Sequence, residues 1–91
     1  DEKYELLDIS RKVQAQLNRF GEIIETVILS SAGYLLITTR KGMQITFSKK
    51  NFREQLERLE GFISFELFSG RLNVIKTMDF RYRNGVSILF K

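Results

Sequence analysis

The segment from residue 75 to residue 91 constrains the fold more than any other part of the chain. Two β-forming runs, residues 75–82 and 86–91, flank the dipeptide Asn84-Gly85. Asn-Gly between β-forming runs is among the strongest short-range signals for a hairpin. The segment therefore predicts two strands joined by a tight turn at Arg83-Asn84-Gly85. The second strand is short and apolar, and we expect it to pair with a neighbour.

Three further strands are predicted upstream of this segment. β-branched and apolar side chains fill residues 22–29, 34–39 and 43–47, which is the composition of strands. The last two of these runs flank Arg40-Lys41-Gly42. A three-residue hairpin loop needs a left-handed residue at its end, and Gly42 can supply one.

Residues 3–20 predict the first helix, because their apolar side chains recur at steps of three and four residues. These side chains are Leu6, Ile9, Val13, Leu17 and Phe20. Gly21 follows directly, and glycine is the usual residue just beyond a helix C-terminus.

A second helix is predicted from Ser48, a good N-cap residue, past Gly61 to Ser69-Gly70. Arg53–Glu57 and Glu54–Arg58 are opposite charges four residues apart, which we place as pairs on its outer face. Several aromatic side chains have a spacing typical of the core, and these are Phe47, Phe52, Phe62, Phe65 and Phe68. Only Tyr82 and Phe90 lie where a sheet edge could present them.

Together these elements predict an α+β fold with the order α-β-β-β-α-β-β. An antiparallel sheet of about five strands with both helices on one face is the natural packing for that order. Asp79 and Arg81 lie two residues apart in a predicted strand, hence on the same face. We interpret them as an ion pair on its solvent side.

The composition gives no support for catalysis. The 91 residues suit one domain with a modest core. The chain has no cysteine and no histidine, so it lacks a thiolate metal site and any Ser-His or Cys-His pair. No glycine-rich phosphate loop is present, and no apolar run reaches the roughly 20 residues of a membrane span. We expect no enzyme activity, cofactor or metal.

Charge is unevenly distributed along the chain. Residues 1–39 carry six acidic and four basic side chains, whereas residues 40–91 carry five acidic and eleven basic ones. A basic half is compatible with a polyanionic partner, but we favour the interpretation as an ordinary soluble surface of mixed charge.

The run Met78-Asp79-Phe80-Arg81-Tyr82-Arg83-Asn84-Gly85-Val86 resembles the closing signature of the FtsQ/DivIB family of bacterial cell-division proteins. In that family an apolar–Asp–apolar–Arg–Tyr–x–Asn–Gly run precedes alternating apolar residues. The rest is similar in its order of elements, including a helix with Leu-x-Arg-Leu character, here Leu56-Glu57-Arg58-Leu59. The resemblance spans nearly the whole chain, and its sharpest motif is residues 78–86.

The resemblance implies that residues 1–91 are a fragment of the C-terminal extracytoplasmic β domain of an FtsQ-type protein, without the POTRA domain and the transmembrane helix that precede it in the family. The parent protein is then expected in the cell inner membrane, with this domain on the periplasmic side. The family does no chemistry. It is a divisome scaffold in septation that joins FtsB and FtsL, and an FtsB segment adds as a strand to its last strand.

Carried over to this sequence, the partner-binding residues are Tyr82, Asn84, Gly85, Val86, Ser87, Ile88, Leu89 and Phe90. Within the last strand, Val86, Ile88 and Phe90 are expected on one face, and Ser87 and Leu89 on the other. A charged residue or proline at Ile88 is expected to abolish partner binding and to leave the fold largely intact.

A small RNA-binding domain is the alternative hypothesis. A helix, three strands and a second helix with a basic half resemble double-stranded-RNA-binding domains, which reach phosphates from the start of their final helix. Lys49, Lys50 and Arg53 could play that part. Two further strands follow where that fold has ended, so we favour the scaffold hypothesis and expect no nucleic-acid partner.

Overall fold

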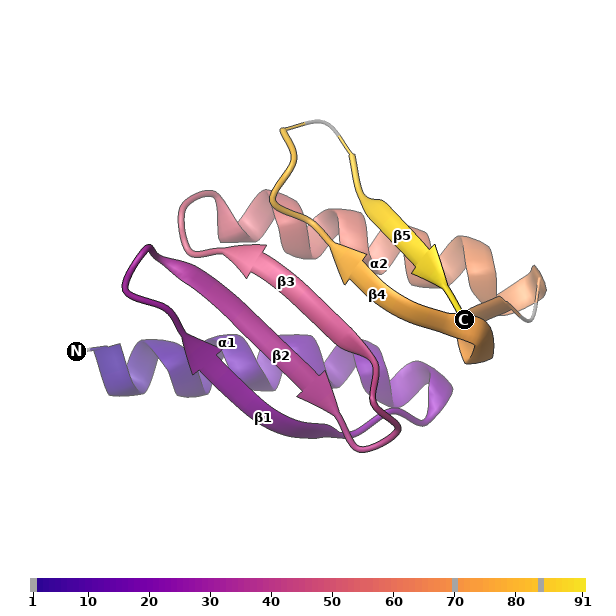
Figure 1. Cartoon of the computed structure of the whole chain (residues 1–91), viewed down its shortest axis with the longest axis horizontal. Coiled ribbons are helices and arrows are strands. Elements are labelled where there is room, and N and C mark those ends of the chain that lie inside the picture. Colours follow the sequence, from indigo (N-terminus) through magenta and orange to yellow (C-terminus); the bar gives the residue numbers. More distant parts are fainter. Residues whose placement is uncertain (1, 70, 84) are drawn as a thin grey trace.

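The computed structural model (Figure 1) describes residues 2–69, 71–83 and 85–91. Its helices and strands follow the predicted order of α-β-β-β-α-β-β. They are α1 (Glu2–Leu17), the 3₁₀ helix η1 (Asn18–Phe20), β1 (Ile24–Leu29), β2 (Tyr34–Thr39), β3 (Gln44–Ser48), α2 (Phe52–Ser69), the 3₁₀ helix η2 (Arg71–Val74), β4 (Ile75–Asp79) and β5 (Ser87–Phe90).

The strands form one five-stranded sheet in the order β1-β2-β3-β4-β5. Three of its pairings are antiparallel, but β3 and β4 run parallel, with Ile45 opposite Met78. The predicted antiparallel sheet of about five strands is thus confirmed for three of its four pairings, and the β3–β4 pairing is the parallel exception. Its cause is α2, because a helix between two neighbouring strands carries the chain back to the starting end of the sheet.

Both helices lie behind the sheet in Figure 1, so they cover one of its faces, as predicted. Alternate residues of the central strands point toward them, including Leu35, Ile37 and Ile45. The apolar stripe of α1 meets these strands through Val13 and Leu17, both fully buried. The stacked rings of Phe47 and Phe80, whose centroids lie 5.3 Å apart, extend the core to β4.

The turns after α1 and between β2 and β3 form as expected. Gly21 ends η1 in the left-handed region with φ 78°, and Gly42 has φ 91° in the β2–β3 turn. There the Gly42 N–H donates to the Thr39 carbonyl at 3.0 Å. A side chain at either glycine would be strained in this conformation.

The start of α2 differs from the prediction. Ser48 is the last residue of β3 rather than the N-cap, and its hydroxyl donates to the Lys50 carbonyl. Asn51 precedes the helix with φ 62°, a conformation that asparagine tolerates better than most residues. The buried Gln55 amide holds this turn by bonding both the N–H and the carbonyl of Ser48. The predicted continuation of the helix through Gly61 is confirmed.

The connection between β4 and β5 is also longer than predicted. The ladder ends where Asp79 pairs with Ser87, so β4 and β5 stop short of the bounds predicted for the two strands, Tyr82 and Val86. The first residue after β4 stays with the neighbouring strand, because the Phe80 N–H donates to Thr46 of β3 at 2.9 Å. The ring of Phe80 is fully buried, so the chain keeps its contact with the core and β3 beyond its last pair with β5. Asn84 lies outside the described residues.

Phe65 corrects the expectation for the aromatic side chains. Its side chain is 71% exposed on the outer surface of α2, while Phe47 is buried and Phe52 and Phe62 pack against the core, as predicted. The buried stripe of α2 passes through Leu59, Ile63 and Glu66, and Phe65 falls off this stripe. The side chain of Phe68 lies outside the described residues.

Candidate functional site

The last strand, β5, lies at one edge of the sheet and has β4 as its neighbour on one side only. The Lys91 N–H donates to the carbonyl of Val74 at 2.7 Å, on the β4 side. Main-chain groups of successive residues in a strand point alternately to its two sides. The N–H and C=O of Ile88 and Phe90 therefore face the open edge, and those of Ser87 and Leu89 face β4.

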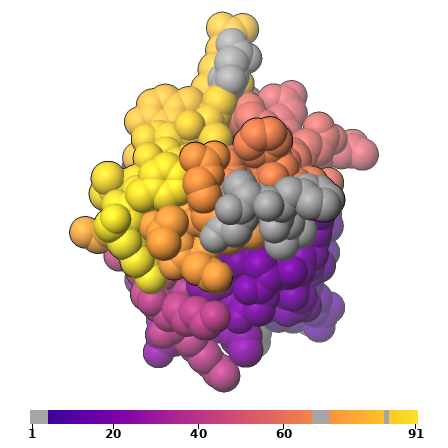
Figure 2. Space-filling model, turned by 90° about the vertical axis from the view of Figure 1, so that its right-hand side faces the viewer, coloured from indigo at the N-terminus to yellow at the C-terminus, as the bar shows by residue number. Residues whose placement is uncertain are grey.

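Side chains along β5 alternate as the sequence predicts. Val86 and Ile88 are half-buried and pack against the core, while Leu89 on the other face is 53% exposed. Phe90 is 41% exposed at the strand end. Figure 2 shows this strand, in yellow, on the surface beside the orange β4. The open edge thus combines main-chain groups with exposed apolar side chains.

The remaining predicted contact residues fall between the end of β4 and the start of β5 in the sequence. Tyr82 is 55% exposed, Gly85 is partly buried, and Asn84 lies outside the described residues. In Figure 1 the described residues that follow β4 extend beyond the end of the sheet. The structure therefore separates the predicted site into a loop and a short edge strand.

Arg58 of α2 contacts the loop. This contact was not predicted from the sequence. Its guanidinium donates to the carbonyls of Phe80 at 2.8 Å, Tyr82 at 2.8 Å and Arg83 at 3.0 Å. The predicted pair with Glu54 is absent from the ion pairs of the described residues. The sequence does hold a signal for the contact between Arg58 and the loop. Gln55, Arg58 and Glu66 are polar residues on or beside the apolar stripe of α2, where polar groups need partners.

The opposite end of β5 is held by Arg71 of η2. Its guanidinium forms a two-pronged contact with the Glu66 carboxylate, which is only 2% exposed, and includes a bond of 2.8 Å from Nε. The hydrogen bond with Glu66 raises the pKa of Arg71. The same guanidinium lies 5.7 Å from the centre of the Phe90 ring, within cation–π range.

Asp79 and Arg81 form the predicted ion pair at the end of β4. Arg81 donates from Nε and Nη2 to the two carboxylate oxygens, at 2.9 and 2.7 Å. These hydrogen bonds lower the pKa of Asp79, although partial desolvation acts in the opposite direction. The Arg81 guanidinium also lies 4.6 Å from the centre of the Tyr34 ring. Arg81 therefore contacts both Asp79 of β4 and Tyr34 of β2.

Basic side chains gather near the loop. Lys50, Arg58, Arg81 and Arg83 line a surface cavity of about 280 Å³, together with the single acidic residue Glu54. Such a cluster attracts anionic groups and raises the encounter rate with an acidic partner. It lies at the end of the sheet where the chain enters β5.

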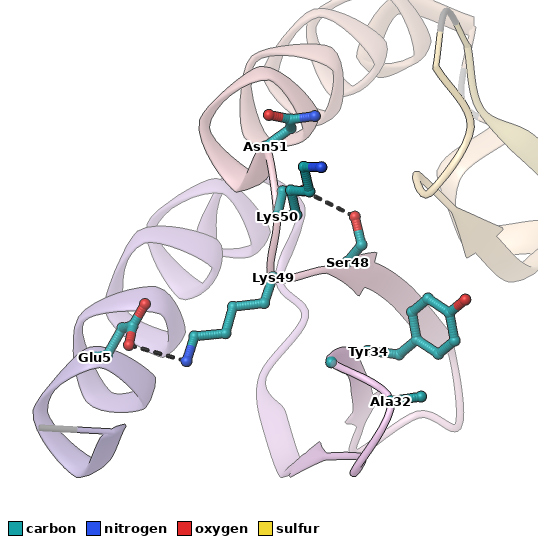
Figure 3. A pocket seen from close by; sticks show the side chains of 8 residues that line it. Glu5, Ala32, Tyr34, Ser48, Lys49, Lys50 and Asn51 are labelled. Carbon is teal, nitrogen blue, oxygen red and sulfur yellow. Dashed lines mark hydrogen bonds and ion pairs between the residues drawn. The ribbon is translucent and has the colours of Figure 1, made fainter.

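Of the residues of the RNA-binding alternative, Lys49 and Lys50 line a hollow of about 640 Å³ beside Glu5 of α1, the start of β2 and the end of β3. Lys50 also lines the cavity next to the loop. Figure 3 shows Lys49 reaching Glu5, and their charged atoms lie 3.2 Å apart. One of the three expected phosphate-binding cations is therefore engaged with a carboxylate. Lys50 and Arg53 are exposed.

The described residues contain no group of three or more acidic side chains placed to hold a metal ion. No helix in the described part has the length and hydrophobicity of a membrane span. No protein-family model and no curated protein matches this chain.

Proposed function

We propose that this chain is a scaffold module of the bacterial divisome, of the FtsQ/DivIB type, which binds the FtsB/FtsL pair by adding an FtsB segment to β5. The family assignment rests on the resemblance of residues 78–86. The observation that carries the mechanism is the position of β5, the last strand of the sheet, with β4 on one side only. By the same resemblance, the parent protein is anchored in the inner membrane with this domain on the periplasmic side.

Strand addition accounts for the chemistry of this edge. Unpaired main-chain groups on an edge strand template a further strand, and here they belong to Ile88 and Phe90. In such complexes the main chain supplies affinity and alternate side chains supply specificity. Leu89 and Phe90 can pack against apolar side chains of the incoming segment, since both are exposed.

The charge around the edge indicates an acidic partner segment. Arg83 lies in the loop and Lys76 on the neighbouring β4. Arg81 and Arg71 also lie near this edge, but each is already paired with a carboxylate, that of Asp79 and that of Glu66. Charges at the rim of an interface act mainly on the association rate and on selectivity. The proposed partner segment would therefore carry carboxylates beside the residues that pair with β5.

The test is an NMR titration of this domain with a synthetic peptide of the FtsB segment that follows its coiled coil, from the genome that encodes this chain. We expect amide shifts concentrated on residues 82–90. Shifts spread over α1 or the β1 edge, or none at a peptide concentration of about 1 mM, would contradict the proposal, because strand addition of biological use requires a Kd well below that concentration.

A backbone variant tests strand addition itself. Replacing Phe90 with phenyllactic acid converts one amide into an ester and removes the N–H that faces the open edge, while the side chain is unchanged. We expect peptide affinity to fall about fivefold to tenfold, the worth of one net hydrogen bond. The matched control is the equivalent ester at Phe65 of α2. Equal affinities for the two esters would exclude main-chain pairing at Phe90.

A further inference from the structure

The two terminal nitrogens of the Arg58 guanidinium, Nη1 and Nη2, both donate hydrogen bonds to one short stretch of main chain. Both nitrogens donate to the β4–β5 loop, at the carbonyls of Phe80, Tyr82 and Arg83. The third nitrogen, Nε, is buried and finds no acceptor among the described residues. Hydrogen bonds to a charged group are stronger than those between neutral groups.

The loop has few other means of holding its shape. Tyr82 and Arg83 are exposed, and residues 80–86 lie outside the β4–β5 ladder. Phe80 anchors the start of the loop through its buried ring and its bond to Thr46. Val86 anchors the far end against the core. Between these anchors, the described hydrogen bonds of the main chain are those from Arg58 to the carbonyls of Phe80, Tyr82 and Arg83, and one from the Arg81 N–H to the Asp79 carboxylate at 3.0 Å. The bond to Asp79 is local, so Arg58 supplies the described link between this part of the loop and α2.

We propose that Arg58 is a positioning residue for partner binding: it holds the β4–β5 loop in the conformation that presents Tyr82 and the start of β5 to the added strand. This inference rests on the proposed function and deepens it, because it adds a residue of α2 that lies away from the open edge. Its partner is the same acidic segment that pairs with β5.

The energetic argument is one of pre-organisation. A binding site that is competent for only part of the time has an apparent Kd raised by the inverse of that fraction. The fork of the arginine side chain matches several carbonyls at once, whereas a lysine ammonium is a point charge without a fixed geometry. Loss of the fork therefore lowers the competent fraction of the loop without removing the charge.

Different residues contact the two ends of β5, so a substitution of Arg58 should affect the loop before the strand and leave the C-terminal end of the strand unchanged. Arg71 and Phe90 are in contact at the C-terminal end, and Ile75 pairs with Phe90. The β4 ladder continues to Ser87 independently of the loop. A change at Arg58 is thus expected at residues 81–86 and not along the strand.

The test compares Arg58→Lys and Arg58→Gln with the control Arg53→Gln, an exposed position on the same helix. In the free domain, amide exchange should become faster at Tyr82 and Arg83 in both Arg58 variants and remain unchanged in β2 and β3. With the FtsB peptide, we expect Arg58→Lys to weaken binding about tenfold, with the loss in the association rate, as expected for a reduced competent fraction. Arg53→Gln should match the unmodified protein.

The outcomes separate this inference from the proposed function. If the peptide binds the unmodified domain at residues 82–90 and Arg58→Lys binds equally well, Arg58 has no positioning role and the proposed function stands. If the unmodified domain does not bind the peptide, the proposed function is wrong. The positioning role of Arg58 is then wrong as well, because it depends on that binding. Faster exchange throughout the sheet of Arg58→Lys would also overturn the inference, because the residue would then stabilise the whole fold.

Discussion

At the scale of single residues, the Asp79–Arg81 pair makes stability depend on pH. Arg81 lowers the pKa of the Asp79 carboxyl, so the folded state binds this proton less tightly than the unfolded chain does. The pair therefore contributes stability above the unfolded pKa of about 3.9, and this contribution is lost as the pH falls through the lower, folded pKa.

We predict that Asp79→Asn lowers the free energy of unfolding at pH 7 by about 0.5 kcal/mol, the range of partly exposed ion pairs after solvent screening. The difference between the variant and the unmodified protein should shrink below pH 4 and vanish in stronger acid. Urea unfolding between pH 2 and pH 7 measures it. The other carboxylates are common to both proteins and cancel in the difference, so a gap that is constant with pH would show that the Asp79 charge is not its source.

Some side-chain contacts could be predicted from the sequence and others could not. The contact between Asp79 and Arg81 was predictable because the two residues lie two apart in an extended chain. Arg58 was assigned to Glu54 by the same local reasoning, yet its carbonyl partners lie 22 to 25 residues away. Such contacts depend on how α2 packs against β4, which spacing along the sequence does not encode.

At the scale of elements, the two helices and the five strands followed from periodicity and turn residues, whereas the edge position of the last strand was expected mainly from the resemblance to the FtsQ/DivIB family. The β4–β5 connection differed from the prediction. Asn84-Gly85 favoured a tight turn directly after Tyr82, but the β4–β5 ladder ends at the pair of Asp79 and Ser87. Phe80 stays with the core and with β3 through its ring stacked on Phe47 and its bond to Thr46, and a local turn motif does not encode such long-range contacts.

The two faces of β5 differ in how well they suit a substitution that tests partner binding. A charged substitution at Ile88 was expected to spare the fold, but this side chain packs against the core and a charge there would also destabilise the domain. Leu89 points to the opposite face and is 53% exposed. It is the better position for removing a side-chain contact.

We predict that Leu89→Glu weakens binding of the FtsB peptide by about tenfold or more, because a carboxylate replaces an apolar contact and repels an acidic partner. The melting temperature should change little. Ile28→Glu on β1 is the matched control, since Ile28 is 55% exposed at the other edge of the sheet. Isothermal titration calorimetry compares the two, and an equal loss of affinity in both variants would argue against β5 as the specific edge.

At the scale of the whole molecule, the uneven charge of the sequence becomes an uneven charge in space. The acidic half, residues 1–39, forms α1, β1 and β2, and the basic half forms β3, α2, β4 and β5. In Figure 1 the elements of the first half lie toward the β1 edge of the sheet and those of the basic half toward the β5 edge. Charge separated in this way orients an approaching acidic segment toward β5.

The distance over which this field acts depends on salt. The longest dimension of the molecule is 39 Å, whereas the Debye length is about 10 Å at 0.1 M salt and about 30 Å at 0.01 M. Near physiological ionic strength, only charges close to the edge can steer the partner. At low salt, charges on the far side contribute as well.

We therefore predict that Arg83→Glu, next to the edge, slows association of the FtsB peptide by on the order of threefold or more at 0.1 M salt. Arg11→Glu makes the same change of charge on α1, at the far side, and should slow association only near 0.01 M. Stopped-flow measurements across this salt range give both rates, while dissociation rates should change less. Equal effects of the two variants at 0.1 M would mean that net charge, rather than the position of the basic cluster, governs the encounter, and the acidic segment would then have no preferred route to β5.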